Sequence, residues 1–509
     1  MSSQTYRSSR CSVEQQLSFE DVVMTGLAND GGLFLPSAIP KLPSDFLESW
    51  KDLSFNELAF EILRLYIDPK EIPDLDLINL IAKSYSKFRS SEITPIRKID
   101  DNLYLLELFH GPTYAFKDVA LQFVGNLFEY FLTRRNANKA DSDREIITVV
   151  GATSGDTGSA AIYGLRGKKD VSVFILYPTG RISPIQEQQM TTVEDANVHT
   201  LSVNGTFDDC QDIVKAIFSD KEFNDKYHVG AVNSINWARI LAQQTYYFYS
   251  YFQLQKELTA KDSKDSKVRF VVPSGNFGDI LAGYYAYKMG LPVDKLIIAT
   301  NENDILDRFM KSGEYSKQQE TGVKATHSPA MDILISSNFE RLLWYLIRDN
   351  VTHDDSKAGE TLNDWMKQLK ENGKFTAPKE VLTAAKLIFD SERVDDEQTI
   401  KTIKEVYTSH PENYIVDPHT SVGVATSYRF IAKDEPSENI QYISLSTAHP
   451  AKFSEVVNKA LDSFDNYSFE KDVLPDELKA LSEKPKRIKL IDEASVEKVK
   501  QAIRDELKF

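Results

Sequence analysis

The chain has little of several features that would assign it quickly to a protein class. Only two cysteines occur in 509 residues, Cys11 and Cys210, and they form neither a C-x-x-C motif nor a disulfide framework. No run approaches the roughly 18 consecutive apolar residues of a membrane helix, so no membrane partner is expected. The net charge of −16 lacks the basic surplus of a nucleic-acid-binding protein. These features indicate a soluble intracellular enzyme with the cytoplasm as its expected compartment.

Histidine is also too sparsely placed to suggest a metal site. The eight histidines show no H-E-x-x-H motif and no ligand spacing at i, i+3 or i+4, so no metal ion is predicted. His110 and His449 adjoin candidate site loops. A hydrogen-bonding role in a turn is the favoured interpretation of both.

What the chain does contain is the composition of a globular enzyme. Hydrophobic residues make up 41% and charged residues 27%, which excludes wholesale disorder, and the length predicts about two to four domains. We expect a mainly helical N-terminal domain over 1–95, an α/β core in two lobes over 96–302 and 413–467, a helical insertion over 303–412 with a linker near Arg393–Glu397, and a charged helical tail over 468–509.

Three strand–loop–helix units predict the sheets of the core. Ile146–Val150 leads into GATSGDTG, Val268–Val272 into PSGNFGD, and Tyr442–Leu445 into STAHPAKF, each followed by a helix. Strands that alternate with helices in this way are typical of an α/β fold with a parallel sheet covered on both faces. Ligands of such sheets bind beyond the carboxyl ends of the strands, where all three loops lie.

The loop PSGNFGD has the composition of a phosphate-binding turn. Gly275 and Gly278 permit positive φ angles and a close approach of backbone N–H groups to an anion. The following helix adds the positive end of its dipole. A tight turn that binds nothing would need the same glycines, so the loop alone leaves both interpretations open.

The loop GATSGDTG offers hydroxyl groups at a second helix start. Thr153, Ser154 and Thr157 can donate hydrogen bonds to a carboxylate. The loop matches neither a Walker A motif nor G-x-G-x-x-G nor the nucleophile elbow G-x-S-x-G. N-capping of the helix by Asp156 or Ser154 is the alternative role, and it can coexist with binding.

Lys117 lies in HGPTYAFKD, at the first turn of a long predicted helix. A cation at that end opposes the helix dipole and is a poor choice for stability alone. The positive potential and partial burial there would lower the pKa of the lysine toward neutrality, which suits a lysine that forms a Schiff base. An exposed lysine beside Asp118 is the alternative.

The order of these features resembles the fold-type-II pyridoxal-phosphate enzymes. The strings HGPTYAFKD, VGATSGDTGSAA, VPSGNFGD, HSPAMDI and DGGLFLP are similar to those of the threonine synthase family. The resemblance covers most of the chain, including the N-terminal block. It implies parallel-sheet large and small domains, pyridoxal 5'-phosphate as cofactor, and a lyase of threonine biosynthesis that converts O-phospho-L-homoserine and water to L-threonine and phosphate.

The resemblance also implies roles for individual residues. It places the cofactor's Schiff base on Lys117. It places Thr447 beside the pyridine nitrogen, where a neutral hydroxyl cannot hold that nitrogen protonated as a carboxylate would, so the ring is a weaker electron sink. Asp156 stands where the wider fold has an asparagine beside the cofactor's phenolic oxygen. The cofactor phosphate is assigned to Gly275, Asn276, Phe277 and Gly278, with Asp279 at the helix start, and the substrate carboxylate to Thr153, Ser154, Gly155, Asp156 and Thr157.

The substrate's own phosphate needs a second cationic site. Lys168, Arg181 and Arg239 lie near predicted strand ends or helix starts, and Arg181 and Arg239 are favoured, with a surface ion pair as the alternative role of each. Another lyase of this fold, such as a threonine or serine dehydratase or a phospholyase, remains an alternative function. A non-catalytic phosphate-binding protein is a further alternative, and both a monomer and a homodimer remain open.

Overall fold

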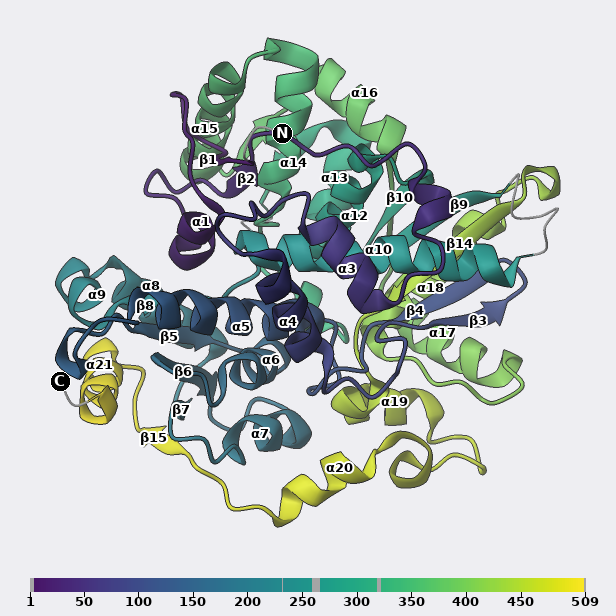
Figure 1. The fold of residues 1–509 in the computed structure, drawn as a ribbon. Coiled ribbons are helices and arrows are strands. Elements are labelled where there is room, and N and C mark those ends of the chain that lie inside the picture. Colours follow the sequence, from purple (N-terminus) through teal and green to yellow (C-terminus); the bar gives the residue numbers. More distant parts are fainter. Residues whose placement is uncertain (1–3, 231, 259–265, 318–321, 508–509) are drawn as a thin grey trace.

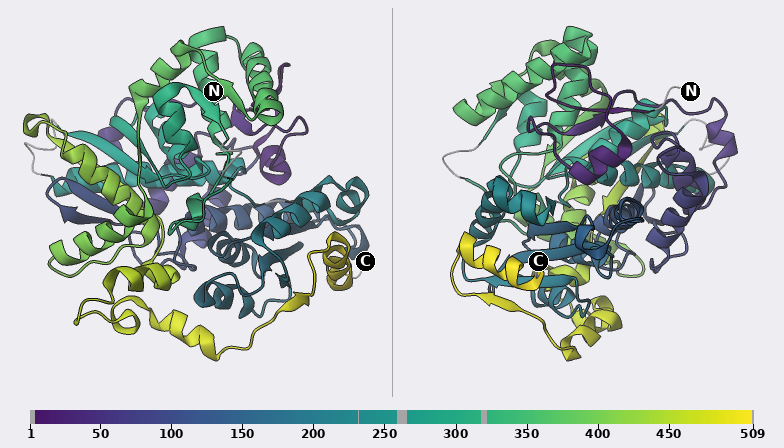
Figure 2. Two further views of the ribbon diagram at one scale, coloured as in Figure 1. Left: turned by 180° about the vertical axis from the view of Figure 1, so that it is seen from behind. Right: turned by 60° about the vertical axis from the view of Figure 1, so that its left-hand side comes forward.

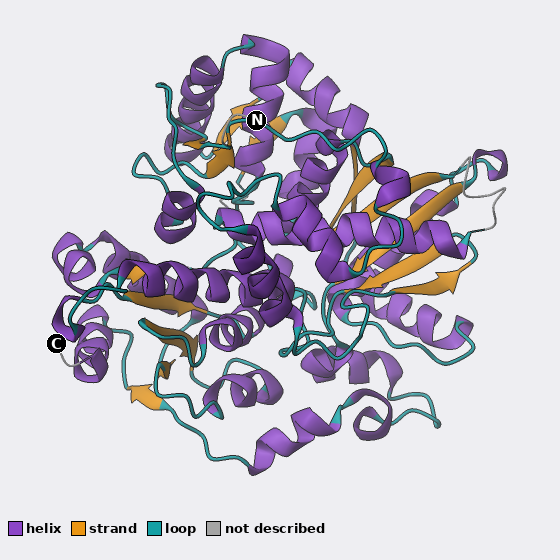
Figure 3. Cartoon of the chain, viewed as in Figure 1, coloured by secondary structure: helices purple, strands orange, loops and turns teal. Residues whose placement is uncertain are grey.

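The structure is a computed structural model that describes residues 4–230, 232–258, 266–317 and 322–507. It has two lobes, each built on a sheet, with the smaller lobe at the lower left of Figure 1 and the larger at the upper right. Helices surround both sheets (Figure 3). Residues 1–3 of the predicted N-terminal domain, 318–321 of the predicted insertion and 508–509 of the predicted tail lie outside the described residues.

The larger lobe contains a six-stranded sheet. All neighbouring strands are parallel except the first pair along the chain, which is antiparallel. In sheet order the strands are β13 (Phe389–Arg393), β10 (Val293–Thr300), β9 (Lys267–Pro273), β14 (Ile440–Ser446), β4 (Leu103–Glu107) and β3 (Ile96–Asp100).

Both faces of this sheet are buried. Phe270 and Val272 of β9 pack into the same core as α10 (Trp237–Glu257) and α12 (Gly278–Met289). Val271, which points the opposite way, packs into a second core together with residues of α17 (Asp396–Ser409) and α18 (Pro418–Ile431). Burial on two faces explains why these strands are apolar without alternation.

The smaller lobe contains a five-stranded sheet that is parallel throughout. One face packs on α5 (Lys117–Arg135) and α6 (Asp156–Leu165), and the other on α8 (Phe207–Ser219), α9 (Lys221–Tyr227) and α21 (Val496–Leu507). The predicted parallel α/β architecture with two sheets is confirmed. In sheet order the strands are β15 (Lys489–Ile491), β7 (Val198–Val203), β6 (Val171–Pro178), β5 (Ile147–Ala152) and β8 (Val229–Gly230).

The N-terminal region is mainly helical, as predicted, with one small antiparallel ribbon of β1 (Tyr6–Ser8) and β2 (Phe34–Pro36). It packs on α5 and α10 of the core. Its third helix begins with a capping box, in which the Ser54 hydroxyl accepts from the Glu57 N–H and the Glu57 carboxylate accepts from the Ser54 N–H. The helices are α1 (Phe19–Thr25), α2 (Phe46–Ser49), α3 (Phe55–Leu63) and α4 (Asp74–Tyr85).

The predicted insertion is largely helical, but part of it belongs to the larger sheet. Its helices are α13 (Ile305–Ser312), α14 (Phe339–Ile347), α15 (Asp355–Asn372) and α16 (Lys379–Ile388), with a ribbon of β11 (Glu314–Ser316) and β12 (Lys374–Thr376). β13 pairs in parallel with β10, so the prediction of a linker near Arg393–Glu397 is wrong: β13 ends there and Asp395 caps α17. The charged sequence of β13 suits a sheet edge, and it lacks the apolar run by which the other parallel strands were predicted.

The C-terminal segment is also not purely helical. After α19 (Ser454–Leu461) and α20 (Asp476–Lys479), it runs from the larger lobe to the smaller one (Figure 2) and adds β15 to the edge of the smaller sheet. Four strands, β11, β12, β13 and β15, thus lie where helices alone were expected, and the domain boundaries stay predictions.

Three observations bear on the class of the molecule. Within the described ranges, every helix is too short or too polar to cross a membrane. Those same ranges contain no group of three or more His, Cys, Asp or Glu side chains that could hold a metal ion. Cys11 and Cys210 are both buried and free.

Candidate active site

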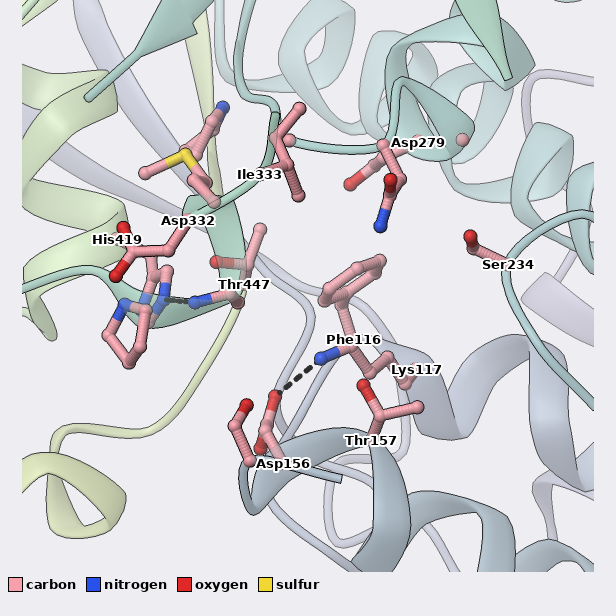
Figure 4. A pocket seen from close by; sticks show the side chains of 18 of the residues that line it. Phe116, Lys117, Asp156, Thr157, Ser234, Asp279, Asp332, Ile333, His419 and Thr447 are labelled. Atoms are coloured by element: carbon pink, nitrogen blue, oxygen red, sulfur yellow. Dashed lines mark hydrogen bonds and ion pairs between the residues drawn. The ribbon is translucent and has the colours of Figure 1, made fainter. Parts of the chain in front are cut away.

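A cavity of about 320 Å³ lies at the carboxyl ends of β5, β9 and β14. The loops after these three strands all contribute to its lining, together with the start of α5 (Figure 4). The structure therefore brings together the three loops that the sequence analysis singled out. The predicted site residues in the lining are Lys117, Thr153, Ser154, Asp156, Thr157, Arg239, Gly275, Asn276, Phe277, Gly278, Asp279 and Thr447.

Lys117 is the first residue of α5 and is buried, with 7% of its surface exposed. Its Nζ lies 3.1 Å from Oδ2 of Asp156 (Figure 4). Burial lowers the pKa of Lys117, the Asp156 carboxylate acts in the opposite direction, and the charges of Arg239 and Lys452 add to the lowering. The alternative of an exposed lysine is excluded, and the side chain has the environment of a reactive amine.

The PSGNFGD loop forms a tight turn between β9 and α12, and neighbouring backbone packs closely against it. Phe277 has a φ of 63°, in the left-handed region. A Cβ atom on Gly275 would lie 3.0 Å from the Ala330 carbonyl oxygen and from Met331 Cα, so this position leaves no room for a larger side chain. The Ser336 hydroxyl donates to the Gly275 carbonyl at 2.6 Å and fixes the turn from outside.

Asp279 is a buried carboxyl group in the first turn of α12. The hydroxyls of Tyr246 and Tyr247 both donate to its Oδ1, whereas Oδ2 is buried without a hydrogen-bond partner. Burial raises the pKa of Asp279 to about 7, against the effect of the two tyrosine hydrogen bonds. The Ser274 hydroxyl is likewise buried and unpartnered, so this wall of the cavity has a hydroxyl donor that a bound anion could satisfy.

The GATSGDTG loop is held by its own threonine. Thr153 Oγ1 accepts from the N–H groups of Gly155 and Gly158, each at 2.9 Å. The N-cap of α6 is Gly155, which has no side-chain cap, so the alternative of capping by Asp156 or Ser154 is wrong. Gly155, with a φ of 138°, packs against Gln186 and is absent from the cavity lining, whereas Ser154 and Thr157 line it.

Asp156 is shared between two lysines. Its Oδ2 faces Lys117, and its Oδ1 lies 2.5 Å from Nζ of Lys452. Burial would raise the pKa of Asp156, but the two ammonium groups outweigh it and hold that pKa well below its usual range. The group is therefore a carboxylate at neutral pH.

Thr447 follows β14 and is buried at the cavity wall. Its carbonyl oxygen accepts from the Phe116 N–H at 2.8 Å. This bond ties the end of β14 to the start of α5, so that the Thr447 side chain and Lys117 share one wall of the cavity.

The three candidate cations for the substrate phosphate are placed differently. Arg239, near the start of α10, lines the cavity and is 3% exposed; its Nη1 donates to the Val232 carbonyl at 3.2 Å and its Nε has no partner. Burial lowers its pKa to about 10. Arg181 is exposed and absent from the lining. Lys168 bonds Asn126 and lies 3.7 Å from Glu129, away from the cavity.

His110 and His449 border a second cavity, of about 510 Å³. His110 Nε2 lies 2.7 Å from Glu107 Oε2, and the Ala451 N–H donates to His449 Nδ1 at 3.2 Å. The interpretation of both as hydrogen-bonding turn histidines is confirmed.

Several lining residues were missed by the sequence analysis. His419 is buried in α18; its Nδ1 lies 2.8 Å from Asp417 and its Nε2 accepts from the Ala330 N–H at 3.0 Å. It therefore holds the loop of the HSPAMDI string against the cavity. That string and STAHPAKF, which contains Lys452, were visible signals. The other polar residues missed in the lining are Gln186, Gln211, Asn233, Ser234, Gln243, Ser274 and Asp332.

Comparisons with known proteins agree with this geometry. Residues 5–85 match the family "Threonine synthase N terminus", residues 88–378 match "Pyridoxal-phosphate dependent enzyme", and residues 420–503 match "Threonine synthase, C-terminal". The chain is 66% identical over 513 residues to a threonine synthase of Saccharomyces cerevisiae, covering 99% of this chain and 98% of that one. It is 44% identical to a threonine synthase of Pseudomonas aeruginosa, covering 87% and 88%.

Solved structures give the same assignment. A crystal structure of threonine synthase from yeast has 65% sequence identity and a TM-score of 0.96, with 99% of each chain covered. A PLP-bound threonine synthase from Brucella melitensis has 39% identity and a TM-score of 0.86, again with 99% of each chain covered. This chain therefore belongs to the threonine synthase family, and it is a pyridoxal-phosphate-dependent lyase of threonine biosynthesis.

Proposed function

We propose that the chain converts O-phospho-L-homoserine and water to L-threonine and phosphate, and that the residues of the cavity divide between cofactor, substrate and proton transfer. The observation that carries the proposal is the buried Lys117, which shares one cavity with a glycine-rich anion cradle and a hydroxyl-rich loop. A family assignment alone would leave the roles of these residues open.

The cavity residues fit pyridoxal 5'-phosphate. Lys117 would hold its carbonyl group, the loop from Gly275 to Gly278 its phosphate at the start of α12, and Thr447 its ring nitrogen. The fit rests on the buried, unpartnered Ser274 hydroxyl, which can donate to a phosphate, and on the close approach of backbone at Gly275. When bound, the cofactor supplies an electron sink for negative charge that develops on the substrate carbons.

We assign the substrate carboxylate to the loop from Thr153 to Thr157. Ser154 and Thr157 present hydroxyl donors to the cavity, and the backbone N–H groups at the start of α6 add a positive dipole end. Thr153 fixes the loop through two backbone hydrogen bonds, Gly155 packs against Gln186, and the ionised Asp156 is directed to the lysines. The loop thus offers donors to an anion and a separate acceptor to Lys117.

Arg239 is the proposed partner of the substrate's phosphate. It is buried in the cavity wall, has a free Nε, and keeps a pKa of about 10, so it is a cation at neutral pH. A guanidinium can bind phosphate oxygens with two parallel hydrogen bonds. Arg181 is exposed and lies outside the lining, so it is no longer proposed to bind the substrate's phosphate.

Lys117 is the proposed base. When the side-chain amine of Lys117 is free, it is positioned to remove the α-proton of the substrate and then to assist loss of a β-proton. Phosphate leaves from the γ-carbon, water adds its hydroxyl group at the β-carbon and releases its other proton to phosphate, and the two removed protons are returned to the γ-carbon, which becomes the methyl group of threonine, and to the α-carbon. Positioned proton transfer of this kind contributes about 10²–10⁴-fold to a rate. Orientation of the substrate by the cavity residues adds to this contribution.

The proposal is tested by supplying O-phospho-L-homoserine to the purified protein loaded with cofactor. We expect L-threonine and phosphate in equal amounts, and loss of both in Lys117→Ala. Formation of 2-oxobutyrate and ammonia in place of threonine would instead indicate a dehydratase or phospholyase. A mass spectrum after borohydride reduction should find the cofactor label on the peptide that contains Lys117, and a label elsewhere would refute the assignment.

We also propose that the enzyme works in the cytoplasm as a monomer or homodimer. Two buried, free cysteines support a reducing compartment. Fluorescence of a tagged chain in cells would test the compartment, and sedimentation equilibrium would test the assembly; an organellar signal or a tetramer would contradict the proposal.

A further inference from the structure

Lys452 is a buried cation beside the active site that the reaction outlined above does not use. It lies in η5 (Pro450–Phe453), after β14, and its side chain is fully buried. Its Nζ is 2.5 Å from Asp156 Oδ1 and donates to the Thr113 carbonyl at 2.8 Å and to the Ser159 hydroxyl at 3.4 Å. The ammonium group thus makes two hydrogen bonds and one ion pair, which together hold the charge in one place.

Asp156 stands between this ammonium group and that of Lys117. Its Oδ2 is 3.1 Å from Lys117 Nζ, and its Oδ1 faces Lys452. A buried carboxylate is tolerated only while cations and hydrogen bonds compensate its lost hydration. Lys117 changes its charge and its bonding during the proposed reaction, so its contact with Asp156 cannot be constant. Lys452 takes no part in the reaction and keeps its contact.

We propose that Lys452 is a positioning residue: it keeps the Asp156 carboxylate ionised and directed at Lys117 throughout the cycle, while its own charge favours the neutral amine of Lys117. The inference rests on the proposed function, because it assigns Lys452 a role in the chemistry of Lys117. It explains why a lysine is buried in full beside the site, where an apolar side chain would avoid the loss of hydration.

The charged groups that face Lys117 come from three elements: Asp156 on α6, Lys452 in η5 and Arg239 on α10. The neighbouring Asp118 is turned away, since both its oxygens accept from Thr113. Removing the charge of Lys452 takes a like charge away from Lys117, so the pKa of Lys117 should rise. Asp156 stays ionised over the range in which a lysine titrates, because that range lies far above the pKa of this carboxyl group.

The first test uses the cofactor-free protein and reads Lys117 itself. An amine reagent is applied briefly at a series of pH values, and labelling of the Lys117 peptide is measured by mass spectrometry. We expect the labelling midpoint to move to higher pH in both Lys452→Met and Lys452→Gln. Gln can still donate to the Thr113 carbonyl, so K452Q decides the matter if K452M does not fold.

A matched control is Lys500→Met. Lys500 is also buried and also lies 2.5 Å from an aspartate, Asp220, but it belongs to α21 on the far side of the smaller sheet. K500M should leave the labelling midpoint of Lys117 unchanged. A midpoint that stays in place or moves to lower pH in folded K452Q would overturn the proposal.

The second test uses the loaded enzyme. K452Q should lower kcat with little change in KM and shift the acid limb of the pH–kcat profile to higher pH, because Asp156 then protonates more readily when Lys117 is engaged. In an Asp156→Asn background, K452Q should change kcat by less than about twofold, since no carboxylate charge remains to be held. Independent, additive losses in the two variants would refute the coupling. Absence of threonine formation by the wild type would refute the proposed function and leave the labelling result standing.

Discussion

Asp279→Asn, at the start of α12, removes a charge and almost no volume. Burial raises the pKa of Asp279 to about 7, compared with an ordinary value of 3.8 that the unfolded chain would have. Between these two values the folded protein holds a proton that the unfolded chain has lost. The stability of the wild type therefore falls as pH rises through this window, and the loss is complete above pH 7. Asparagine carries no such proton, so the variant avoids the loss.

The size of the effect follows from the pKa difference. A shift of one unit corresponds to about 1.4 kcal/mol, so the full shift of roughly three units corresponds to about 4 kcal/mol. The stability of D279N relative to the wild type should increase by about 2.5 kcal/mol between pH 5 and pH 7.5. For a cooperative transition in a chain of this length, that is a relative gain of about 2 °C in Tm.

Scanning calorimetry of both cofactor-free proteins from pH 5 to pH 8 measures this difference. General pH effects on the rest of the chain cancel because the two proteins differ at one side chain. Asp364→Asn, on the exposed side of α15, serves as the control, and its difference from the wild type should stay within about 0.5 kcal/mol at every pH. A D279N difference that is constant, or that shrinks as pH rises, would show that Asp279 is ionised at a normal pKa despite its burial.

Three further predictions concern the site and its scaffold. Arg239→Met should raise KM for O-phospho-L-homoserine about tenfold or more by removing a charged hydrogen bond, with Arg181→Met unchanged, as measured by phosphate release. Gly275→Ala should weaken pyridoxal-phosphate binding in absorbance titrations, because its Cβ would press on the backbone of residues 330–331. Gly125→Ala should cost about 1–3 kcal/mol of stability, seen as a lower Tm, because its Cβ would overlap the facing backbone of α6. Unchanged KM, cofactor affinity or Tm, respectively, would contradict each.

The catalytic loops could be recognised in the sequence because their requirements are local. Gly275 lies in a turn that needs close backbone approach, and Lys117 is the first residue of a long helix, where a cation is unfavourable. The parallel strands were predicted for a similar reason, since burial on both faces leaves continuous apolar runs such as that of β9. Such signals depend on neighbours within a few residues, and the order of the motifs added the family resemblance.

Other features depend on parts of the chain that are far apart. β13 has a charged sequence and β15 has only three residues, and both are strands because β10 and β7 offer them a free edge. Arg181 and Arg239 looked equivalent along the chain; only the course of the backbone puts one of them in the cavity wall and the other in solvent.

Lys452 shows the difference most clearly. In the sequence it is one lysine in a loop, whereas in the fold it meets Thr113, Asp156 and Ser159, which are some 300 residues away. Turn geometry and helix periodicity are properties of a short stretch of backbone, so they can be recognised in the sequence. The charge state and partner of a side chain depend on distance and on exclusion of water, and both arise only when distant segments pack together.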